Sequence, residues 1–189
     1  MQLQLKISMG ASFLFLLIEL ILNLHRRSVS GSGTRQADKG SLSLIWITIT
    51  VCLTLGFNLG EHGKWSVADN FIGIAGILLY CSGLVIRLIA VRQLSEAFTV
   101  DVAYKEGQKL RTEGVYRLVR HPSYLGGLMT IMGISMGMGT LLSIIVVTVP
   151  VFLAFNYRMI VEEKLLLDSF GDSYREYQSK TRRIIPYIY

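Results

Sequence analysis

The chain has 189 residues, a formal net charge of +6, and a composition that is 51% hydrophobic but only 17% charged. Soluble domains carry nearer a quarter of charged residues, so these proportions favour one integral membrane domain over a soluble enzyme. The positive charge does not indicate nucleic-acid binding, because the basic residues lie between apolar blocks, where lipid headgroups would contact them.

Five apolar segments are predicted to span the membrane, at about 7–24, 42–59, 71–91, 124–138 and 141–158. About 20 residues cross the hydrocarbon core. The last two segments come from one apolar block that is too long for a single span, and its glycines place a turn near 137–140. Four spans is the competing number. The first segment is expected to be a retained helix rather than a cleaved signal peptide, because His25-Arg26-Arg27 follows it directly.

Three polar segments separate or follow the predicted spans. Residues 28–40 are rich in serine and glycine and predict a flexible linker. Residues 98–112 alternate around Glu106-Gly107, which favours a short hairpin. Residues 161–180 have the pattern of an amphipathic helix in which Gly171 is a weak spot. That helix could lie at the membrane interface or form a lid over a site.

The distribution of basic residues predicts the orientation of the spans. Segments 25–41 and 92–123 and the C-terminal tail are rich in lysine and arginine, whereas segment 60–70 contains only Lys64. Positively charged loops stay on the cytoplasmic side. The pattern therefore predicts a multi-pass protein with an outside N-terminus, a cytoplasmic C-terminus and a cytoplasmic C-terminal amphipathic helix.

Two charged residues fall within predicted spans. Intramembrane charge is costly, so Glu19 and Arg87 are functional candidates by default, although they could also pair with each other or extend to the interface. No role is assigned to either residue. No metal site is predicted, because the three histidines are far apart and no cysteine or carboxylate pattern accompanies them.

Arg158 and Glu162 are candidates for chemistry, because residues four apart share one face of a helix. An arginine at a span end that extends to the surface and forms an ion pair remains the alternative. Glu163 is expected to be solvated or to pair within its own helix. His121 precedes a proline and should cap the fourth span, where free backbone N–H groups suit an anionic group.

These pieces occur in a specific order: Lys109-Leu110-Arg111-Thr112-Glu113-Gly114-Val115-Tyr116, then Arg120-His121-Pro122-Ser123-Tyr124-Leu125-Gly126, then Arg158-x-x-x-Glu162-Glu163, then Phe170-Gly171-x-x-Tyr174-x-x-Tyr177. The series resembles the isoprenylcysteine carboxyl methyltransferase family and its prokaryotic relatives. The resemblance covers roughly residues 95–189. It implies an all-α integral membrane methyltransferase of one domain, residues 1–189, with its catalytic half at 95–189.

The resemblance also implies the cofactor, S-adenosylmethionine, and the site. Catalytic roles would go to Arg158, which would face the methyl acceptor, and to Glu162, which would also contact the cofactor. The other cofactor-binding positions would be Gln108, Lys109, Leu110, Arg111, Tyr116, His121, Pro122, Ser123 and Tyr124. Gln108 stands where many relatives have histidine, so that contact is a departure. A lipophilic, isoprenylcysteine-like acceptor bearing a carboxylate would enter from the bilayer.

Three alternatives remain open at this stage. The first is a methyltransferase of the same architecture that acts on a phospholipid amine or a thiol. The second is an NADPH-dependent sterol-type reductase, whose Arg-x-Pro-x-Tyr-x-Gly region and Ile-Pro-x-Tyr tail are similar; Gly127 lies where those enzymes tend to have an acidic residue. The third is a membrane scaffold that binds no cofactor.

Overall fold

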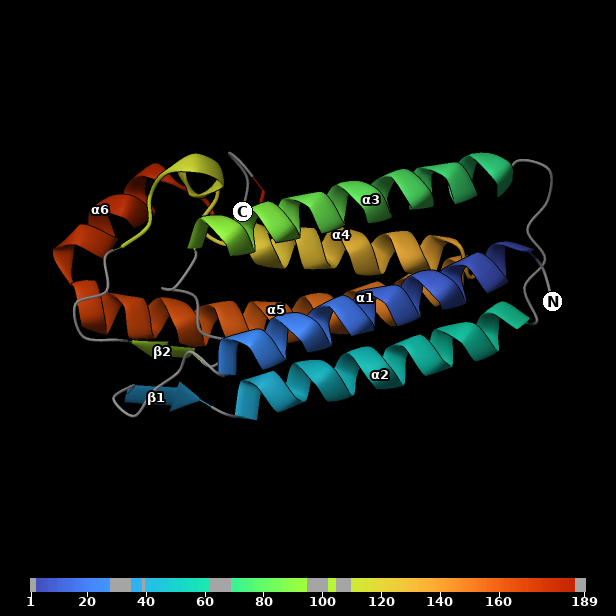
Figure 1. The fold of residues 1–189 in the computed structure, drawn as a ribbon, viewed down its shortest axis with the longest axis horizontal. Coiled ribbons are helices and arrows are strands. Elements are labelled where there is room, and N and C mark those ends of the chain that lie inside the picture. Colours follow the sequence, from blue (N-terminus) through green and yellow to red (C-terminus); the bar gives the residue numbers. More distant parts are fainter. Residues whose placement is uncertain are drawn as a thin grey trace.

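In the described part of the chain, five α-helices run side by side and a short sixth α-helix packs at one end (Figure 1). The computed structural model describes residues 3–27, 35–38, 40–61, 69–94, 102–104 and 110–185. The helices are α1 (Leu3–Arg27), α2 (Gly40–Glu61), α3 (Asp69–Leu94), α4 (Pro122–Met136), α5 (Leu141–Phe170) and α6 (Asp172–Lys180). The other described elements are the strands β1 (Arg35–Asp38) and β2 (Val102–Tyr104) and the 3₁₀ helix η2 (Gly114–Arg117).

Each of the five predicted spans overlaps a described helix, but the helices differ from the predicted spans in length. Among the described residues, α1, α2, α3 and α5 are long and apolar enough to cross a membrane. The fourth predicted span is α4, which has 15 residues and is shorter than a usual span. Large apolar side chains lie exposed on the outer faces of the bundle, including Phe13, Phe71 and Leu153. Such surfaces are expected where lipid rather than water is the solvent.

The connections differ from the expectations in two places. Residues 28–40 are not a structureless linker throughout, because β1 lies within them and pairs antiparallel with β2. The strand pairing in the 98–112 region is therefore with a distant loop rather than within a local hairpin. Glu106 and Gly107, where that hairpin was expected to turn, lie outside the described residues.

The turn between α4 and α5 and the break before α6 lie at predicted glycines. Gly137 ends α4, and Gly139 has φ +90°, in the left-handed region that glycine adopts without strain. The fifth span is longer than expected, because α5 continues through Pro150 to Phe170. Gly171, with φ +54°, then ends α5 and begins α6, so the predicted 161–180 helix is two helices.

Helices α3 and α4 approach each other closely through glycines. A Cβ atom on Gly133 would lie 2.6 Å from the backbone nitrogen of Tyr80, and one on Gly83 would lie 2.6 Å from that of Thr130. Small residues let helix backbones come this near in a membrane protein. The start of α4 is therefore fixed firmly against the end of α3.

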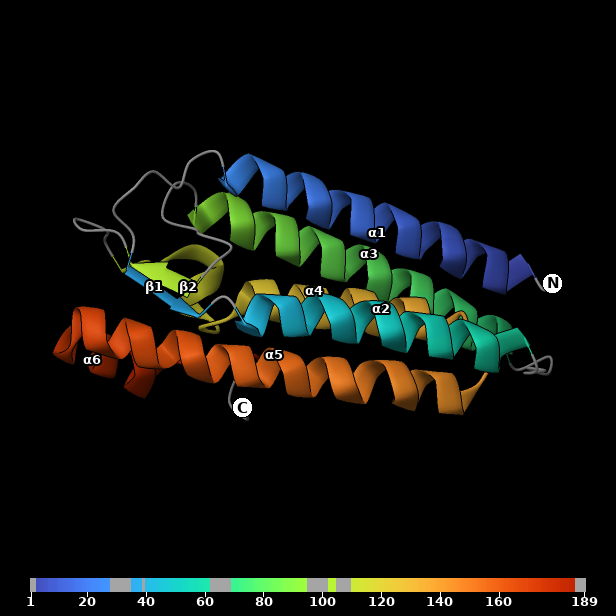
Figure 2. The same ribbon diagram turned by 90° about the horizontal axis from the view of Figure 1, so that it is seen from below.

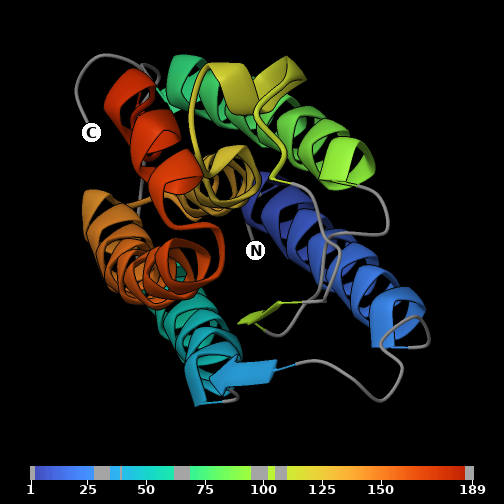
Figure 3. The same cartoon turned by 90° about the vertical axis from the view of Figure 1, so that its left-hand side faces the viewer.

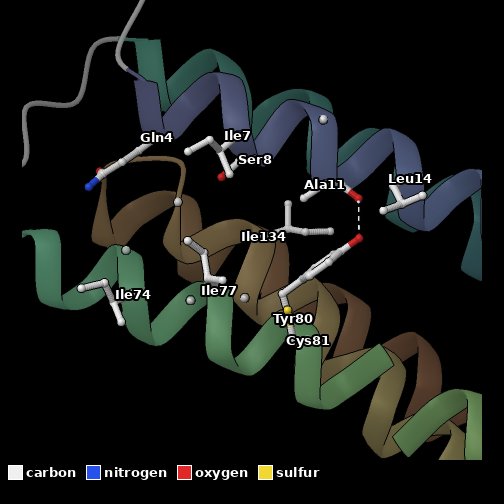
Figure 4. A pocket seen from close by; sticks show the side chains of 15 residues that line it. Gln4, Ile7, Ser8, Ala11, Leu14, Ile74, Ile77, Tyr80, Cys81 and Ile134 are labelled. Atoms are coloured by element: carbon white, nitrogen blue, oxygen red, sulfur yellow. Dashed lines mark hydrogen bonds between the residues drawn. The ribbon is translucent and has the colours of Figure 1, made fainter. Parts of the chain in front are cut away.

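Strands β1 and β2, the helix η2 and helix α6 gather at one end of the bundle (Figures 2 and 3). Near the other end, a largely apolar cavity of about 590 Å³ lies between α1, α3 and α4. There the Tyr80 hydroxyl donates a hydrogen bond of 3.2 Å to the Ala11 carbonyl (Figure 4). The hydrophobic core lies between these two ends, where α2, α4 and α5 meet around Ile131, Val147 and Val151.

Candidate functional site

The candidate site lies at the end of the bundle where α4 begins and α5 continues beyond it. The segment leading into α4 is tied to the end of α3 by two hydrogen bonds. The backbone N–H of Val115 donates to Gln93 Oε1 at 2.9 Å, and the Tyr116 hydroxyl donates to the Ala90 carbonyl at 3.1 Å. Gly114 has φ +64°, a conformation that turns the chain into η2. Tyr116 is thereby buried beneath the segment.

The C-terminal segment binds to the chain just before α4. The N–H of Arg120 donates to the Arg182 carbonyl at 2.7 Å, and the N–H of His121 donates to the Arg183 carbonyl at 2.9 Å. These bonds occupy backbone donors near the N-terminus of α4. They also bring Arg183 to the site, although it lies far from the other site residues in the sequence.

Helix α6 packs over the same segment and closes the site from outside the span region. The Tyr177 hydroxyl donates to the Tyr116 carbonyl at 2.6 Å. Burial raises the pKa of Tyr177 to about 12, although Arg120 and Thr181 act in the opposite direction. The hydroxyl therefore remains a donor at neutral pH. Of the two predictions for this region, the contacts fit a lid packed on a site.

Glu163 is the centre of a buried charge cluster. Its carboxylate accepts hydrogen bonds from Arg120 Nε at 2.9 Å and from Arg183 Nη2 at 2.9 Å, and His121 Nε2 lies 3.3 Å away. The residue is only 7% exposed. The expectation that Glu163 is solvated or pairs within its helix is therefore wrong. A buried carboxylate held by two arginines fixes α5, α4 and the C-terminal segment relative to one another.

Arg158 and Glu162 meet through Tyr124. The Tyr124 hydroxyl donates to Glu162 Oε2 at 2.9 Å and accepts from Arg158 Nε at 3.0 Å. Arg158 also donates through Nη1 to the Ser41 hydroxyl of α2, at 2.7 Å. The arginine is 4% exposed, so it does not extend to the surface. The buried cation of Arg158 thus forms one hydrogen-bonded chain with a half-buried phenol and a half-buried carboxylate, across α2, α4 and α5.

The rings around this chain hold Tyr124 in place. Its ring packs edge-on against His121, with centroids 5.6 Å apart, and against Phe155, with centroids 5.4 Å apart. His121 is the N-cap residue of α4 and Pro122 is its first residue, which confirms the predicted helix start. Ser123 is buried and receives hydrogen bonds from Arg87.

The structure brings together several, but not all, of the predicted site residues. His121, Ser123, Tyr124, Arg158 and Glu162 form one neighbourhood. Arg111 is exposed, with its Nη2 3.9 Å from the Glu113 carboxylate, and Leu110 is half-buried beside it in sequence. Gln108 and Lys109 lie outside the described residues.

Four residues that the predicted site omitted also take part in it: Glu163, Arg183, Tyr174 and Ser41. Tyr174 is 1% exposed, and its hydroxyl is the buried side-chain atom that has no hydrogen-bond partner among the described residues. Burial raises the pKa of Tyr174; Glu163 and Glu162 raise it further, and Arg120 lowers it. A buried hydroxyl without a partner is costly and is typical of a site that binds a ligand.

The described part of the chain contains no cluster of side chains that could bind a metal ion. No three His, Cys, Asp or Glu side chains gather there in a group that could hold an ion. His121 instead faces Glu163 and Tyr124.

Comparison with known proteins agrees with the arrangement of helices and site. The family model described as phospholipid methyltransferase matches residues 71–173. Protein-S-isoprenylcysteine O-methyltransferase A of Arabidopsis thaliana is 33% identical over 149 residues, which is 78% of this chain and 71% of the relative. A probable enzyme of that name from Oryza sativa subsp. indica is 35% identical over 120 residues, and the match spans 62% of this chain and 63% of the relative.

A solved structure has the same fold. It is that of a eukaryotic intramembrane Ras methyltransferase, isoprenylcysteine carboxyl methyltransferase, with a TM-score of 0.64 and 25% identity. The match covers 74% of this chain and 52% of that one. Apolar helices around a buried polar site define an integral membrane protein. The chain belongs to the protein-S-isoprenylcysteine O-methyltransferase family.

Proposed function

We propose that this protein is a membrane methyltransferase that transfers a methyl group from S-adenosylmethionine to a carboxylate on a lipophilic, isoprenylcysteine-like acceptor. The observation that carries the proposal is the hydrogen-bonded chain of buried Arg158 with half-buried Tyr124 and Glu162 at the end of the span region. It places an anion-binding group and a cation-binding group on either side of one phenol. Family membership supplies the reaction class.

The residues of the site fit the methyl donor. The donor carries an ammonium, a carboxylate and a sulfonium cation that supplies an electrophilic methyl group. Glu162 would hold the ammonium, and the partnerless hydroxyl of Tyr174 would donate to an anionic oxygen. The ring of Tyr124 offers an aromatic face to a cation. The family pattern adds Leu110, Arg111, Tyr116, His121, Pro122 and Ser123, together with Gln108 and Lys109 from the part outside the described residues.

Arg158 is the residue for the acceptor. A guanidinium can hold a carboxylate through charge-assisted hydrogen bonds, and this one is oriented by Ser41 and Tyr124. A carboxylate acceptor needs no general base, so the work of these residues is to align two reactants away from water. The burial of Arg158 supports such a dry site. The acceptor's apolar part would enter between the helices from the bilayer.

We place the site on the cytoplasmic side of the membrane. Strands β1 and β2, the helix η2 and helix α6 lie at the same end of the bundle as Ser41, at the start of α2, and Arg158, near the exit of α5. The sequence segments to which these elements belong, 25–41, 92–123 and the C-terminal tail, carry most of the lysine and arginine. The positive-inside rule therefore favours a cytoplasmic catalytic face and C-terminus. Labelling of single cysteines in residues 62–68 and in α6, on intact cells, tests the orientation.

Ligand-dependent thermal stabilisation of the purified protein in detergent tests the methyl-donor site. S-adenosylmethionine and its demethylated product should raise the midpoint of unfolding, because a ligand of the folded state stabilises it. The Glu162→Ala variant should lose most of this effect. Glu176→Ala is the matched control, since Glu176 is an exposed glutamate on α6. Stabilisation by NADPH alone, with none by the methyl donor, would overturn the proposal in favour of a reductase; no stabilisation by either would favour a scaffold.

A second acceptor class is favoured by one observation, the match to the phospholipid methyltransferase family model. A phospholipid amine would have to lose a proton, for which His121 and Glu162 are the nearby candidates. Methyl transfer from labelled donor distinguishes the acceptors. We expect label on a farnesylated cysteine derivative with a free carboxylate, and none on its preformed methyl ester. Label on phosphatidylethanolamine vesicles instead would transfer the proposal to the amine class.

A further inference from the structure

Glu19 and Arg87 form an ion pair between α1 and α3, within the span region. Arg87 donates through Nε to one carboxylate oxygen of Glu19 and through Nη2 to the other, the second bond being 2.6 Å long. The side chain of Arg87 is 15% exposed and that of Glu19 is 11% exposed. Of the two readings that the sequence left open, pairing rather than extension to the interface is therefore observed. Charges are costly in this region, so the pair needs an explanation.

The same guanidinium also binds the start of α4. Its third nitrogen, Nη1, donates to both the carbonyl oxygen and the hydroxyl of Ser123, each at 2.9 Å. Ser123 is the second residue of α4 and lies between His121 and Tyr124 in the sequence. One arginine thus links α1 and α3 to the turn that carries two residues of the candidate site.

The backbone leaves Arg87 little freedom relative to that turn. A Cβ atom added to Gly126 would lie 2.6 Å from the Arg87 nitrogen and 2.6 Å from the Gly83 carbonyl oxygen. The two helices are therefore in backbone contact at the level of the arginine. With the backbone fixed, Glu19 determines in which direction the guanidinium points. Without the carboxylate, only the Nη1 bonds to Ser123 would hold the guanidinium, and the planar fork would no longer be oriented from the Glu19 side.

We propose that Glu19 and Arg87 are positioning residues for the methyl-donor half of the site. Their pair holds Ser123, and through it the first turn of α4, from the side opposite α5. His121 and Tyr124 are then directed toward Glu163 and Glu162 on α5. This inference rests on the proposed methyltransferase function. The acceptor-side arginine, Arg158, is on α5 and anchored by Ser41, so it should depend less on the pair.

Three variants separate positioning from simple stabilisation. Arg87→Lys keeps a positive partner for Glu19, but an ammonium cannot bridge Glu19 and Ser123 as a planar fork does. The double variant Glu19→Leu/Arg87→Met replaces the buried pair with apolar groups, a change that is often neutral for stability. Tyr80→Phe is the matched control, because it removes a different contact between α3 and α1, the bond to the Ala11 carbonyl, away from Ser123.

Two measurements test whether the pair positions the site. The first is the dissociation constant of S-adenosylhomocysteine, measured by calorimetry below each variant's unfolding temperature. The second is the KM for each substrate. We expect Arg87→Lys and the double variant to weaken cofactor binding about tenfold and to raise the cofactor's KM, with a smaller change in the acceptor's KM. Tyr80→Phe should leave binding unchanged. The double variant should unfold near the wild-type temperature, which shows that lost affinity is not lost folding.

The outcomes also separate this inference from the proposed function. If wild-type protein binds the cofactor and the double variant binds it equally well, Glu19 and Arg87 only support the fold and the inference is overturned. Equal weakening by Tyr80→Phe and Arg87→Lys would overturn it too, because any loosening of α1 would then suffice. If a double variant unfolds early, Arg87→Lys alone carries the test. Wild-type protein that binds no cofactor overturns the proposed function first.

Discussion

The Tyr124 hydroxyl donates to the Glu162 carboxylate across the gap between α4 and α5, at 2.9 Å. The Tyr124 hydroxyl oxygen also accepts a hydrogen bond from Arg158, so one phenol sets the spacing between the guanidinium and the carboxylate. Both charged residues lie on α5, and the phenol from α4 fixes how their side chains are placed relative to each other. The functional consequence is that donor and acceptor groups would be aligned by a residue that need not react itself.

Replacement of Tyr124 by phenylalanine should therefore impair turnover more than folding. The ring remains packed on Phe155 and His121, while Arg158 and Glu162 lose their shared partner. We expect kcat to fall about tenfold to a hundredfold, since small misplacements of reacting groups have effects of this size. Kinetics and thermal unfolding of the same preparation measure both quantities. Unchanged kcat would show that the phenol does not align the site.

Loss of Arg158 should separate methyl transfer from binding of the methyl donor. Arg158→Ala removes the group assigned to the acceptor carboxylate and leaves Glu162 in place. We expect kcat/KM for the acceptor to fall at least about a hundredfold, with much less change in donor affinity. Arg175→Ala, which removes an exposed arginine of α6, is the control. Equal losses of turnover and donor binding would reject the acceptor-side role.

Glu163 should matter chiefly for stability. In Glu163→Gln, Arg120 and Arg183, which now share a buried carboxylate, would be left with a neutral partner. We expect a loss of about 3 kcal/mol, the range seen when one partner of a buried pair is removed. Glu176→Gln breaks an exposed pair with Lys180 and should leave stability nearly unchanged. Denaturation of both variants in one detergent compares them. Similar midpoints would contradict the interpretation that Glu163 is the centre of a buried charge cluster.

Hydropathy predicted the helices because the bilayer imposes one simple requirement. Backbone groups in lipid must be satisfied within helices, so a long apolar segment has few other structures to adopt. Turn chemistry did the rest at Gly139 and Gly171, whose positive φ angles only glycine adopts freely. The length of α5 was underestimated because polar residues after Arg158 ended the apolar pattern but did not end the helix.

The carboxylate pair shows why the site was harder to predict than the spans. Glu162 and Glu163 are adjacent, and successive helix residues point about 100° apart, so the two side chains must contact different neighbours. Helical spacing favoured Glu162, which does lie with Arg158 around Tyr124. The partners of Glu163 include Arg183, which reaches it only because α6 reverses the chain. A pattern of spacing within one helix carries no information about such a return.

Alkaline pH should weaken the attachment of α6. Burial raises the pKa of Tyr177 to about 12 in the folded protein, against 10.0 for an unperturbed tyrosine. A group whose folded pKa is raised contributes stability that is complete below pH 10 and is lost as pH rises through about 12. The stability difference between wild-type protein and Tyr177→Phe should therefore shrink over this window, from about 1 kcal/mol at neutral pH. A difference that stays constant from pH 8 to 12 would contradict this.

The effect of Tyr174→Phe on stability should differ between the free protein and the protein with bound ligand. Its hydroxyl is buried without a partner among the described residues, so Tyr174→Phe removes an uncompensated polar group and should leave the free protein equally stable or slightly more stable. With S-adenosylhomocysteine bound, the hydroxyl would gain its partner, and the variant should lose part of the ligand-induced rise in unfolding temperature. Tyr177→Phe serves as the control. The Tyr177 hydroxyl is already bonded to the Tyr116 carbonyl, so its removal should destabilise the free protein. If Tyr174→Phe destabilises the free protein and keeps the full ligand response, its hydroxyl has a structural partner and no part in binding the methyl donor.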